Sequence, residues 1–344
     1  MDNFWKNKTV AVTGAFGFVG SRMCNTLSSL GANVYGFIKP ANPFTFSPID
    51  EMPGKYIWNY KRDSFSKSLT VIANNIIDFP LNDPNMMQAV LGNIGGNGVD
   101  IVIHLAAQAI VTKAGNTPYY TISNNISSTH GLLEACLNIG RNKNISVVLA
   151  STDKVYGNQP VLPYTEDMNL LGAGPYDASK VCCDVLARCY AQSGLNIGIT
   201  RNANIYGPND YNTSRIIPGT IISVLNGEMP VIRSDGKPMR DYLYIDDCIN
   251  GYLLLAELLY DKSIKSGEAY NLSSNSPINV IDLYKKILSS CGKMDIEPRI
   301  LSQAKTEIEK QWLNSDKIRK LGWKSEVGLD EGLSKTVEWI KEKL

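Results

Sequence analysis

Short apolar runs alternate with longer amphipathic segments through the first two thirds of the chain. The longer segments carry apolar residues at three- and four-residue spacing, most clearly at Tyr119–Ile139 and Tyr176–Gln192, and this spacing predicts helices. The alternation is typical of βαβ units, so we expect an α/β fold with a doubly wound parallel sheet covered by helices on both faces. The apolar runs predict strands at Lys8–Thr13, Asn33–Ile38, Thr70–Ile77, Asp100–Leu105, Ser146–Ser151 and Asn196–Arg201.

Two stretches depart from this alternation. Pro40–Ser68 is rich in Pro, Asn and aromatic residues and too irregular for a helix, so we expect a surface excursion with room for a short hairpin. After Tyr206-Gly207-Pro208 the pattern becomes mixed, which predicts a smaller α/β lobe. We therefore expect a first domain at 1–200 and a substrate-binding lobe at 201–344, interleaved with it. The lobe is predicted to hold helices at Ser214–Asn226, Asp247–Tyr260, Val280–Ser290 and Leu329–Lys343 and a strand near Val231.

Composition and charge narrow the class of protein. The 344 residues are 44% hydrophobic, and the formal net charge is +1 without long runs of one sign, so we expect no nucleic-acid and no membrane partner. Met1–Lys8 is polar and unlike a signal peptide, and the longest apolar stretch, Gly251–Tyr260, is too short to span a bilayer. A cytoplasmic location is expected.

Cysteine and histidine usage argues against a disulfide framework and a metal site. The seven cysteines are odd in number and show no C-x-x-C spacing. Cys182, Cys183 and Cys189 fall within one predicted helix and are interpreted as packing residues. The two histidines, His104 and His130, have no cluster of further ligands in the sequence and are interpreted as structural.

A glycine-rich turn follows the first predicted strand. Thr9–Gly20 reads TVAVTGAFGFVG, and Gly14, Gly17 and Gly20 lie between the strand and a helical segment. Glycines at this spacing permit a tight turn, let backbone amides approach a pyrophosphate, and allow the helix to pack closely on the strand. Because a strand and a helix flank it, the turn predicts a Rossmann-type dinucleotide-binding domain.

The choice between NAD and NADP stays open at the end of the second predicted strand. The acid that binds an adenosine ribose would fall near Ile38, and the sequence instead reads Phe37-Ile38-Lys39. Lys39 is suited to a 2′-phosphate but equally to solvent at a strand end. Asp78, at the end of the third predicted strand, is a candidate adenine contact or a cap of a helix or turn.

Tyr176 and Lys180 form the spacing Y-x-x-x-K at the start of a predicted helix. Four residues place both side chains on one helix face. A lysine ammonium beside a phenol favours the phenolate, so Tyr176 is a candidate base near neutral pH. Ser151 and Thr152, at the end of a predicted strand, strengthen this interpretation.

Together these motifs resemble the extended short-chain dehydrogenase/reductase superfamily over almost the whole chain. Within it the sequence is similar to nucleotide-sugar 4,6-dehydratases, and the stretches HLAAQAIV, TDKVYG, LPYTED and PYDASK resemble the CDP-glucose 4,6-dehydratase branch most. The motifs are Gly14-x-x-Gly17-x-x-Gly20, His104-Leu-Ala-Ala-Gln108, Ser151–Gly157, Tyr176-x-x-x-Lys180, Arg201-x-x-Asn204-x-Tyr206-Gly207-Pro208, Arg240-Asp241-Tyr242 and Leu321-Gly322-Trp323.

The resemblance implies roles for five catalytic residues. Tyr176, supported by Lys180, would take the proton from the sugar O4 while hydride leaves C4 for the nicotinamide, and Thr152 would hydrogen-bond that oxygen. Water would then be lost across C5–C6, with Asp153 as the acid and Lys154 in the position of the base, and hydride would return to C6. A lysine acts as a base only when neutral. The alternative is that Lys154 pairs with Asp153 or a substrate hydroxyl without proton transfer.

The resemblance also assigns binding residues and partners. It implies NAD or NADP as cofactor, a nucleotide-activated hexose as substrate, and a homodimer formed through Tyr119–Ile139 and Tyr176–Gln192. The substrate residues are Gln108, Asn204, Arg215 and Arg240, where arginine suits a diphosphate. The cofactor residues are Gly14, Phe16, Gly17, Phe18, Val19, Gly20, Lys39, Asp78, Leu105, Ala106 and Ala107, together with Tyr176 and Lys180.

Three functions compete on these residues. A 4,6-dehydratase uses every motif, and a dehydratase of different regiochemistry would use the same ones. A 4-epimerase or 4-oxidoreductase shares the hydride chemistry but needs no acid–base pair after Thr152, so Asp153-Lys154 favours dehydration. A dinucleotide-sensing binding protein would not need Thr152, Tyr176 and Lys180 together.

Overall fold

The computed structural model describes residues 4–38, 48–52, 55–62, 65–73, 75–78, 80–303 and 308–344. The chain divides into two compact units. The first consists of Met1–Val155, Leu170–Arg201 and Tyr252–Tyr270, and the second of Tyr156–Asn169, Asn202–Gly251 and Asn271–Leu344. Among the described residues, no helix is long and apolar enough to cross a membrane.

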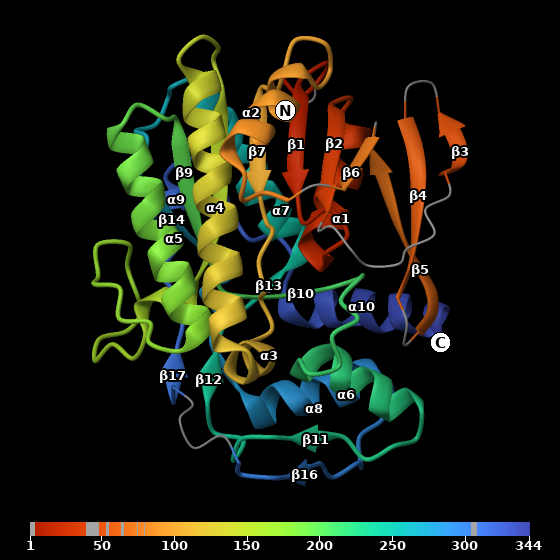
Figure 1. The fold of residues 1–344 in the computed structure, drawn as a ribbon. Coiled ribbons are helices and arrows are strands. Elements are labelled where there is room, and N and C mark those ends of the chain that lie inside the picture. Colours follow the sequence, from red (N-terminus) through yellow and green to blue (C-terminus); the bar gives the residue numbers. More distant parts are fainter. Residues whose placement is uncertain are drawn as a thin grey trace. The chain divides into compact units, whose positions relative to one another are not determined.

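A seven-stranded sheet forms the centre of the first unit (Figure 1). The pairs β1–β2, β1–β7, β2–β6 and β7–β8 are parallel. The chain fills the sheet outward from β1 in one direction and then from β7 in the other, so the strand order reverses between β1 and β7. Ligands bind at such a reversal, beyond the carboxyl ends of the strands. The order is β14 (Ala269–Leu272), β9 (Ile197–Asn202), β8 (Ser146–Thr152), β7 (Ile101–His104), β1 (Thr9–Thr13), β2 (Asn33–Ile38) and β6 (Asn75–Asp78).

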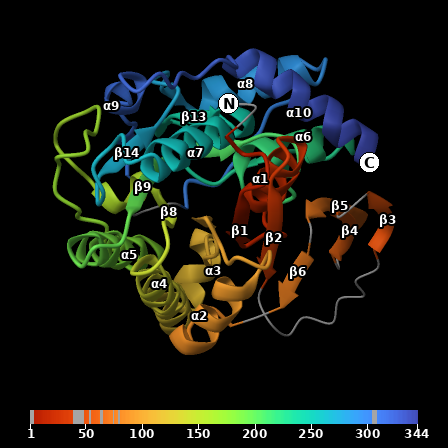
Figure 2. The same cartoon turned by 90° about the horizontal axis from the view of Figure 1, so that it is seen from above.

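Helices cover this sheet on both faces, as Figure 2 shows for α2 (Pro84–Asn93), α4 (Pro118–Gly140) and α5 (Pro175–Gln192) on one side and α1 (Phe18–Ser29) on the other. The central strands β1 and β7 are buried along their whole length. Strands buried on both faces are apolar without alternation, which explains why short apolar runs were a reliable strand signal here. The predicted doubly wound fold is confirmed.

The region between β2 and α2 differs in part from the prediction. The strands β3 (Pro48–Met52), β4 (Lys55–Arg62) and β5 (Phe65–Ala73) form an antiparallel sheet, so the excursion is more regular than a single hairpin. The single strand predicted at Thr70–Ile77 is wrong, because its first residues end β5 and its last belong to β6. Two asparagines, at positions 74 and 75, interrupt that apolar run in the sequence.

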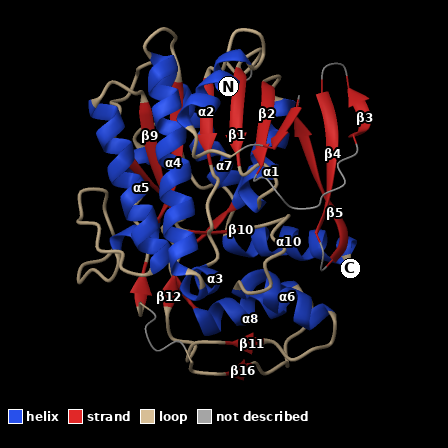
Figure 3. Ribbon diagram, in the orientation of Figure 1, coloured by secondary structure: helices blue, strands red, loops and turns tan. Residues whose placement is uncertain are grey.

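The second unit consists of short strands and amphipathic helices (Figure 3). β10 (Asn204–Tyr206) pairs with β13 (Tyr242–Tyr244), and β11 (Val231–Ile232) pairs with β16 (Arg299–Ile300). A third sheet has the order β15 (Ile278–Asn279), β12 (Met239–Arg240) and β17 (Lys310–Gln311). The predicted helices are confirmed within two residues at each end: α6 (Ile216–Leu225), α7 (Ile245–Tyr260), α8 (Val280–Ser290) and α10 (Leu329–Lys343). Of these, α7 is shared, since its residues from Tyr252 onward belong to the first unit. The short helices are α3 (Val111–Asn116) in the first unit and α9 (Asp316–Arg319) in the second.

Candidate active site

The glycine turn between β1 and α1 has the compact geometry that its sequence predicts. Gly14 has a φ of +72°, and a Cβ there would lie 3.1 Å from the backbone N of Ala106. A Cβ on Gly20 would lie only 2.1 Å from the carbonyl oxygen of Gly14, and Gly17 N donates to the same oxygen at 2.8 Å. Only glycine fits such approaches. Phe16, Phe18 and Val19 complete this turn and the first residues of α1.

The turn fits an anionic dinucleotide. It ends at the amino terminus of α1, whose N-cap is Gly17, and backbone N–H groups at a helix start attract a diphosphate. The predicted neighbours Leu105, Ala106 and Ala107 follow β7 and lie against Gly14 through Ala106. At the adenosine end, Lys39 lies outside the described residues. The backbone of Asp78 pairs with Ile38 at the end of β2.

A hydrogen-bond network joins this turn to helix α4. Thr13 Oγ1 lies 2.8 Å from His104 Nδ1, and His104 Nε2 lies 3.0 Å from Thr129 Oγ1. The backbone amides of Leu105 and Ala106 both donate to Thr13 Oγ1, each at 3.1 Å. Burial, and secondarily the charge of Lys180, lower the pKa of His104 to about 3. His104 is therefore neutral and structural, as predicted, and it holds the ends of β1 and β7 together.

Thr152, Asp153 and Lys154 lie where β8 ends and a 3₁₀ turn, Asp153–Tyr156, begins. Thr152 Oγ1 donates to Asp153 Oδ1 at 3.0 Å, and Lys154 N donates to Thr152 Oγ1 at 3.4 Å. Both Thr152 and Asp153 are buried. The tight turn therefore gathers the hydroxyl, the carboxylate and the lysine at the carboxyl edge of the sheet, where the fold binds ligands.

Tyr176 and Lys180 lie one turn apart at the amino end of α5, which begins at Pro175. Lys180 is buried, and its Nζ donates to the carbonyl oxygen of Ala150 in β8, two residues before Thr152. Burial lowers the pKa of Lys180, and electrostatic interactions with Cys183 and Asp184 oppose that shift. A buried ammonium close to a phenol stabilises the phenolate, so the geometry suits Tyr176 as a base.

Gln108 and Asn125 connect the loop after β7 with α5. The backbone N–H of Gln108 donates to Asn125 Oδ1 at 2.7 Å, and Asn125 Nδ2 donates to Ser179 Oγ at 2.9 Å. The side-chain oxygen of Gln108 accepts from Ile110 N at 3.1 Å. Asn125 was missed at the sequence level. Its signal is a stripe of polar residues at four-residue spacing on an otherwise apolar helix face, since Thr121, Asn125 and Thr129 are all buried.

Asp177 was also missed, although it directly follows Tyr176. Its pKa is raised, first by burial; the positive charge of Lys154 opposes that rise and the negative charge of Asp153 adds to it. A Cβ on Gly172 would lie 2.7 Å from the Lys154 carbonyl oxygen and 3.0 Å from Asp177 Cβ. An acidic residue in the first turn of α5 is usually interpreted as a helix-dipole partner, which hides its proximity to the residues after Thr152.

The three predicted nucleotide-binding residues beyond residue 200 belong to the second unit. Asn204 Nδ2 donates to the carbonyl oxygen of Asp241 at 3.2 Å. Arg215, the N-cap of α6, forms an ion pair of 2.9 Å with the buried Asp210. Arg240 is buried and donates to the carbonyl oxygen of Met239 at 2.7 Å and to that of Ile308. Each guanidinium is thus already oriented by the protein.

Two of the three cysteines predicted to pack in α5 are not packed within the protomer. Cys183 is buried, but Cys182 and Cys189 are exposed. They are seven positions apart, so both lie on one face of the helix, which also carries the exposed Val185. The apolar character of a short run of residues did not distinguish the buried helix face from the exposed one.

Comparison with known proteins agrees with this architecture. Residues 11–336 match the family model described as GDP-mannose 4,6 dehydratase. A trifunctional UDP-glucose 4,6-dehydratase/UDP-4-keto-6-deoxy-D-glucose 3,5-epimerase/UDP-4-keto-L-rhamnose-reductase of Arabidopsis thaliana is 29% identical over 97% of this chain, which spans about half (47%) of that relative's length. A CDP-glucose 4,6-dehydratase of Salmonella typhimurium is 28% identical, with 98% of this chain and 92% of the relative covered.

Solved structures show the same fold with two chemistries. DesIV, a dTDP-glucose 4,6-dehydratase from Streptomyces venezuelae solved with NAD, superimposes with a TM-score of 0.80 at 26% identity, covering 97% of both chains. A UDP-glucose 4-epimerase from Thermotoga maritima, solved with UDP-glucose, also gives 0.80 at 26% identity, covering 97% of this chain and 99% of the other. The resemblance to nucleotide-sugar dehydratases of the extended short-chain dehydrogenase/reductase superfamily is confirmed. With 326 of its 344 residues inside the family match (11–336), the chain belongs to the GDP-mannose 4,6 dehydratase family.

Proposed function

We propose that this protein is an NAD(P)-dependent nucleotide-sugar 4,6-dehydratase that converts a nucleotide-activated hexose into a 4-keto-6-deoxy sugar. The observation that carries the proposal is the 3₁₀ turn after β8, which presents Asp153 and Lys154 beside Thr152 in the same unit as Tyr176 and Lys180. Elimination of water needs an acid and a base on one face of the sugar, and adjacent residues of a tight turn meet that need.

The chain's own residues supply the proton transfers. Tyr176, as phenolate beside Lys180, accepts the proton of the O4 hydroxyl, and the Thr152 hydroxyl hydrogen-bonds the same oxygen. The resulting C4 ketone makes the C5 proton acidic. Asp153 then protonates the departing C6 hydroxyl, and Lys154 occupies the position of the base that removes the C5 proton.

The cofactor site lies in the glycine turn. Gly14, Gly17 and Gly20 would hold the diphosphate at the start of α1, and Leu105 to Ala107 would line its nicotinamide side. A nicotinamide held there would supply the redox chemistry of the reaction, which needs a hydride acceptor at C4 and a hydride donor at C6. The NAD found in the DesIV structure supports a cofactor of this class, and the residues described at the adenosine end suit neither NAD nor NADP in particular.

For the substrate, we favour a CDP-glucose-like nucleotide sugar, supported by the sequence motifs and by the 28% identity to the Salmonella enzyme. Arg215 and Arg240 are the proposed diphosphate ligands of the second unit. The second candidate is a 4-epimerase, favoured by the TM-score of 0.80 to the Thermotoga epimerase. Epimerisation at C4 needs no acid–base pair after Thr152, so it would give Asp153 and Lys154 no catalytic role.

The test combines purified protein, both cofactors and a panel of CDP-, dTDP-, UDP- and GDP-sugars, followed by mass spectrometry and NMR. We expect loss of one water from one member of the panel. An unchanged mass with a new sugar isomer would establish epimerisation instead, and accumulation of reduced cofactor would indicate a dehydrogenase. Tyr176→Phe serves as control and should lower turnover by about 10²–10⁴-fold while retaining cofactor binding.

A further inference from the structure

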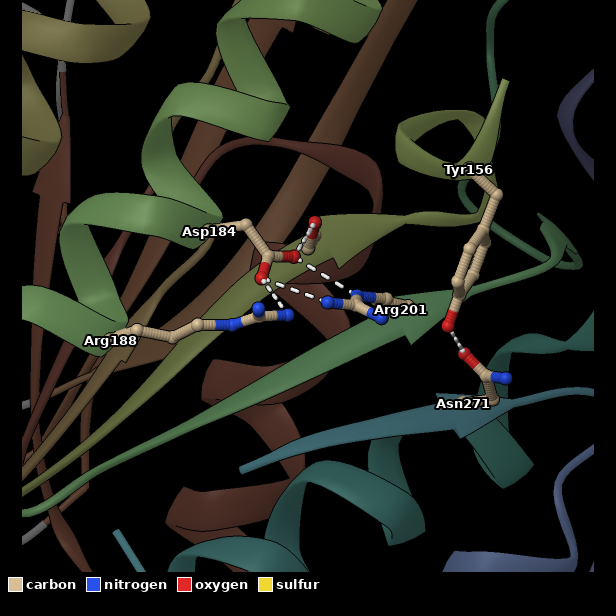
Figure 4. Close-up of polar contacts among 6 residues, drawn as sticks. Tyr156, Asp184, Arg188, Arg201 and Asn271 are labelled. Atoms are coloured by element: carbon tan, nitrogen blue, oxygen red, sulfur yellow. Dashed lines mark hydrogen bonds and ion pairs between the residues drawn. The ribbon is translucent and has the colours of Figure 1, made fainter. Parts of the chain in front are cut away.

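Asp184 is a fully buried carboxylate that the dehydratase motifs leave without a role. It lies one turn after Lys180 on the same face of α5. Its Oδ2 accepts from Arg201 Nε at 3.1 Å and its Oδ1 accepts from Arg201 Nη2 at 3.1 Å, a two-point contact between side chains that are both 0% exposed. Figure 4 shows Arg201 of β9 facing Asp184.

Asp184 also binds the strand that carries the proposed catalytic turn. Ser151 Oγ donates to Asp184 Oδ2 at 3.1 Å, while Lys180 Nζ donates to the carbonyl oxygen of Ala150. Two side chains one helical turn apart on α5 therefore hold two consecutive residues of β8. The next residue along the strand is Thr152, so this contact sets the position of the Thr152–Asp153 turn relative to α5.

More positively charged than negatively charged side chains surround Asp184. Arg201 is buried beside it, and Arg188 Nη2 lies 3.4 Å from Oδ1 with its side chain 44% exposed. The Lys180 ammonium is the third cation of α5 and β9 in this group, and Cys183 and the neutral His104 are the other titratable groups that interact with Lys180. Among the contacts described above, Asp184 supplies the carboxylate. Its charge raises the pKa of Lys180 against the effect of burial.

We propose that Asp184 is a positioning residue for the reaction: anchored by Arg201, it fixes Ser151 at the end of β8 and supports the positive charge of Lys180 beside Tyr176. The inference rests on the proposed function for its catalytic consequence. Its electrostatic part concerns Lys180 alone and is measured without substrate. A purely structural ion pair would change the free energy of unfolding but leave the titration of Lys180 in the folded protein where it was.

The decisive variant is Asp184→Asn in the full chain. Side-chain carbon NMR of the lysines, with Lys180 assigned through Lys180→Met, follows the Lys180 titration in wild type and variant. We expect the Lys180 midpoint to fall in Asp184→Asn, because an opposite charge nearby is removed. An unchanged midpoint in folded Asp184→Asn would overturn the proposal. Since no substrate is used, this result stands even if no nucleotide sugar is turned over.

The matched control is Arg188→Met, which removes the half-exposed partner of the same carboxylate. We expect the Lys180 midpoint and the turnover of this variant to match wild type, and a fall equal to that of Asp184→Asn would overturn the proposal. With an active substrate, the alkaline limb of the kcat profile of Asp184→Asn should move to lower pH by the same amount as the Lys180 midpoint, with less turnover above that midpoint.

Loss of a buried carboxylate that pairs with arginine can prevent folding. If Asp184→Asn does not fold, Ser151→Ala tests the positioning role instead. This variant keeps the ion pair of Asp184 with Arg201 and removes the Ser151 hydroxyl that joins Asp184 to β8. We expect faster amide hydrogen exchange at Thr152 and Asp153, with wild-type exchange at the start of β8, and a several-fold lower kcat at unchanged KM. Wild-type exchange at both amides would overturn the positioning role.

Discussion

Thr13 and His104 join the carboxyl ends of β1 and β7 through a contact of 2.8 Å between Thr13 Oγ1 and His104 Nδ1. Because Thr13 Oγ1 already accepts from two backbone amides, its own hydrogen must point to Nδ1. The proton of the neutral ring then resides on Nε2, which donates to Thr129 Oγ1. The Thr129 hydroxyl in turn donates a hydrogen bond to the carbonyl oxygen of Asn125 at 2.8 Å. One directed chain of hydrogen bonds thus links the glycine turn to α4.

Thr13→Val should disrupt this chain at its first member. The variant keeps the shape of the side chain but leaves the amides of Leu105 and Ala106 without their acceptor. Loss of such partners costs about 1–3 kcal/mol, so we expect that decrease in the free energy of unfolding, measured by urea denaturation, together with weaker cofactor binding. Thr13→Ser, which retains the hydroxyl, should lie close to wild type. Equal losses in both variants would show that packing of the methyl group is decisive.

The buried His104 predicts a specific acid sensitivity. Its pKa falls from 6.5 in the unfolded chain to about 3 in the folded protein. Between these two pKa values the imidazole is protonated in the unfolded state but neutral in the folded state. The contribution of His104 to stability is therefore complete above about pH 6.5 and is lost as the pH falls toward 3. The expected slope is about 1.4 kcal/mol per pH unit in that window.

Urea denaturation of wild type and His104→Asn between about pH 7 and pH 5 measures this slope. Carboxylates titrate in both proteins, so the difference between the two slopes isolates His104. We expect a flatter dependence in the variant, although its stability near neutral pH is lower because it loses a hydrogen bond to Thr129. Parallel slopes would mean that His104 is protonated in the folded protein.

Gly20→Ala tests the geometry of the proposed cofactor turn. A Cβ at this position would lie 2.1 Å from the Gly14 carbonyl oxygen, so α1 must move away from the turn to admit it. We expect loss of NAD(P) binding by at least about tenfold, measured by calorimetry, since a shift of this helix start removes amides from the diphosphate.

The control for this change is Gly92→Ala in α2. A Cβ at Gly92 meets no heavy atom within 4 Å among the described residues. Alanine replaces glycine within a helix at a gain of about 1 kcal/mol. We expect this variant to bind cofactor as wild type and to unfold at higher urea concentration. Normal cofactor binding by Gly20→Ala would place the diphosphate elsewhere.

Asp153→Asn separates the two halves of the proposed reaction. The amide oxygen still accepts from Thr152 Oγ1, as the carboxylate does at 3.0 Å, but an amide cannot protonate a leaving hydroxyl. We expect water loss to slow by about 10²–10⁴-fold, with a smaller effect on oxidation at C4. Rapid-quench mass spectrometry combined with the absorbance of reduced cofactor measures both steps, and reduced cofactor should accumulate. The control is Asp261→Asn, which changes an exposed aspartate and should leave both steps unchanged. Equal slowing of both steps by Asp153→Asn would show that Asp153 is not the acid.

The parts of the fold that could be predicted from the sequence are those in which the local hydrophobic pattern and the tertiary structure agree. β1, β7 and β8 are apolar because both faces of the sheet are covered, and the glycine turn is recognisable because close backbone contacts exclude any side chain. The division between β5 and β6 was not predictable from hydrophobicity, because one apolar run serves two sheets.

The catalytic motifs were visible as motifs, whereas their supporting residues were not. Asp184 and Arg201 are 17 positions apart in sequence, and Thr13 and His104 are 91 apart. Only the fold brings such partners within hydrogen-bond distance. A buried aspartate in an amphipathic helix looks like a surface residue until its exposure is known, since most aspartates are exposed.

The homodimer expected from the family resemblance is tested at the exposed faces of α4 and α5. Val185 is 55% exposed on α5 and Tyr119 is 86% exposed on α4, so both helices present apolar side chains that the protomer leaves uncovered. Val185→Glu introduces a charge that burial between two copies would penalise. We expect wild type to elute as a dimer in size-exclusion chromatography with light scattering, and the variant to shift toward monomer. Val161→Glu, at a position 60% exposed outside these helices, should remain dimeric. A dimeric Val185→Glu would exclude this part of α5 from the interface.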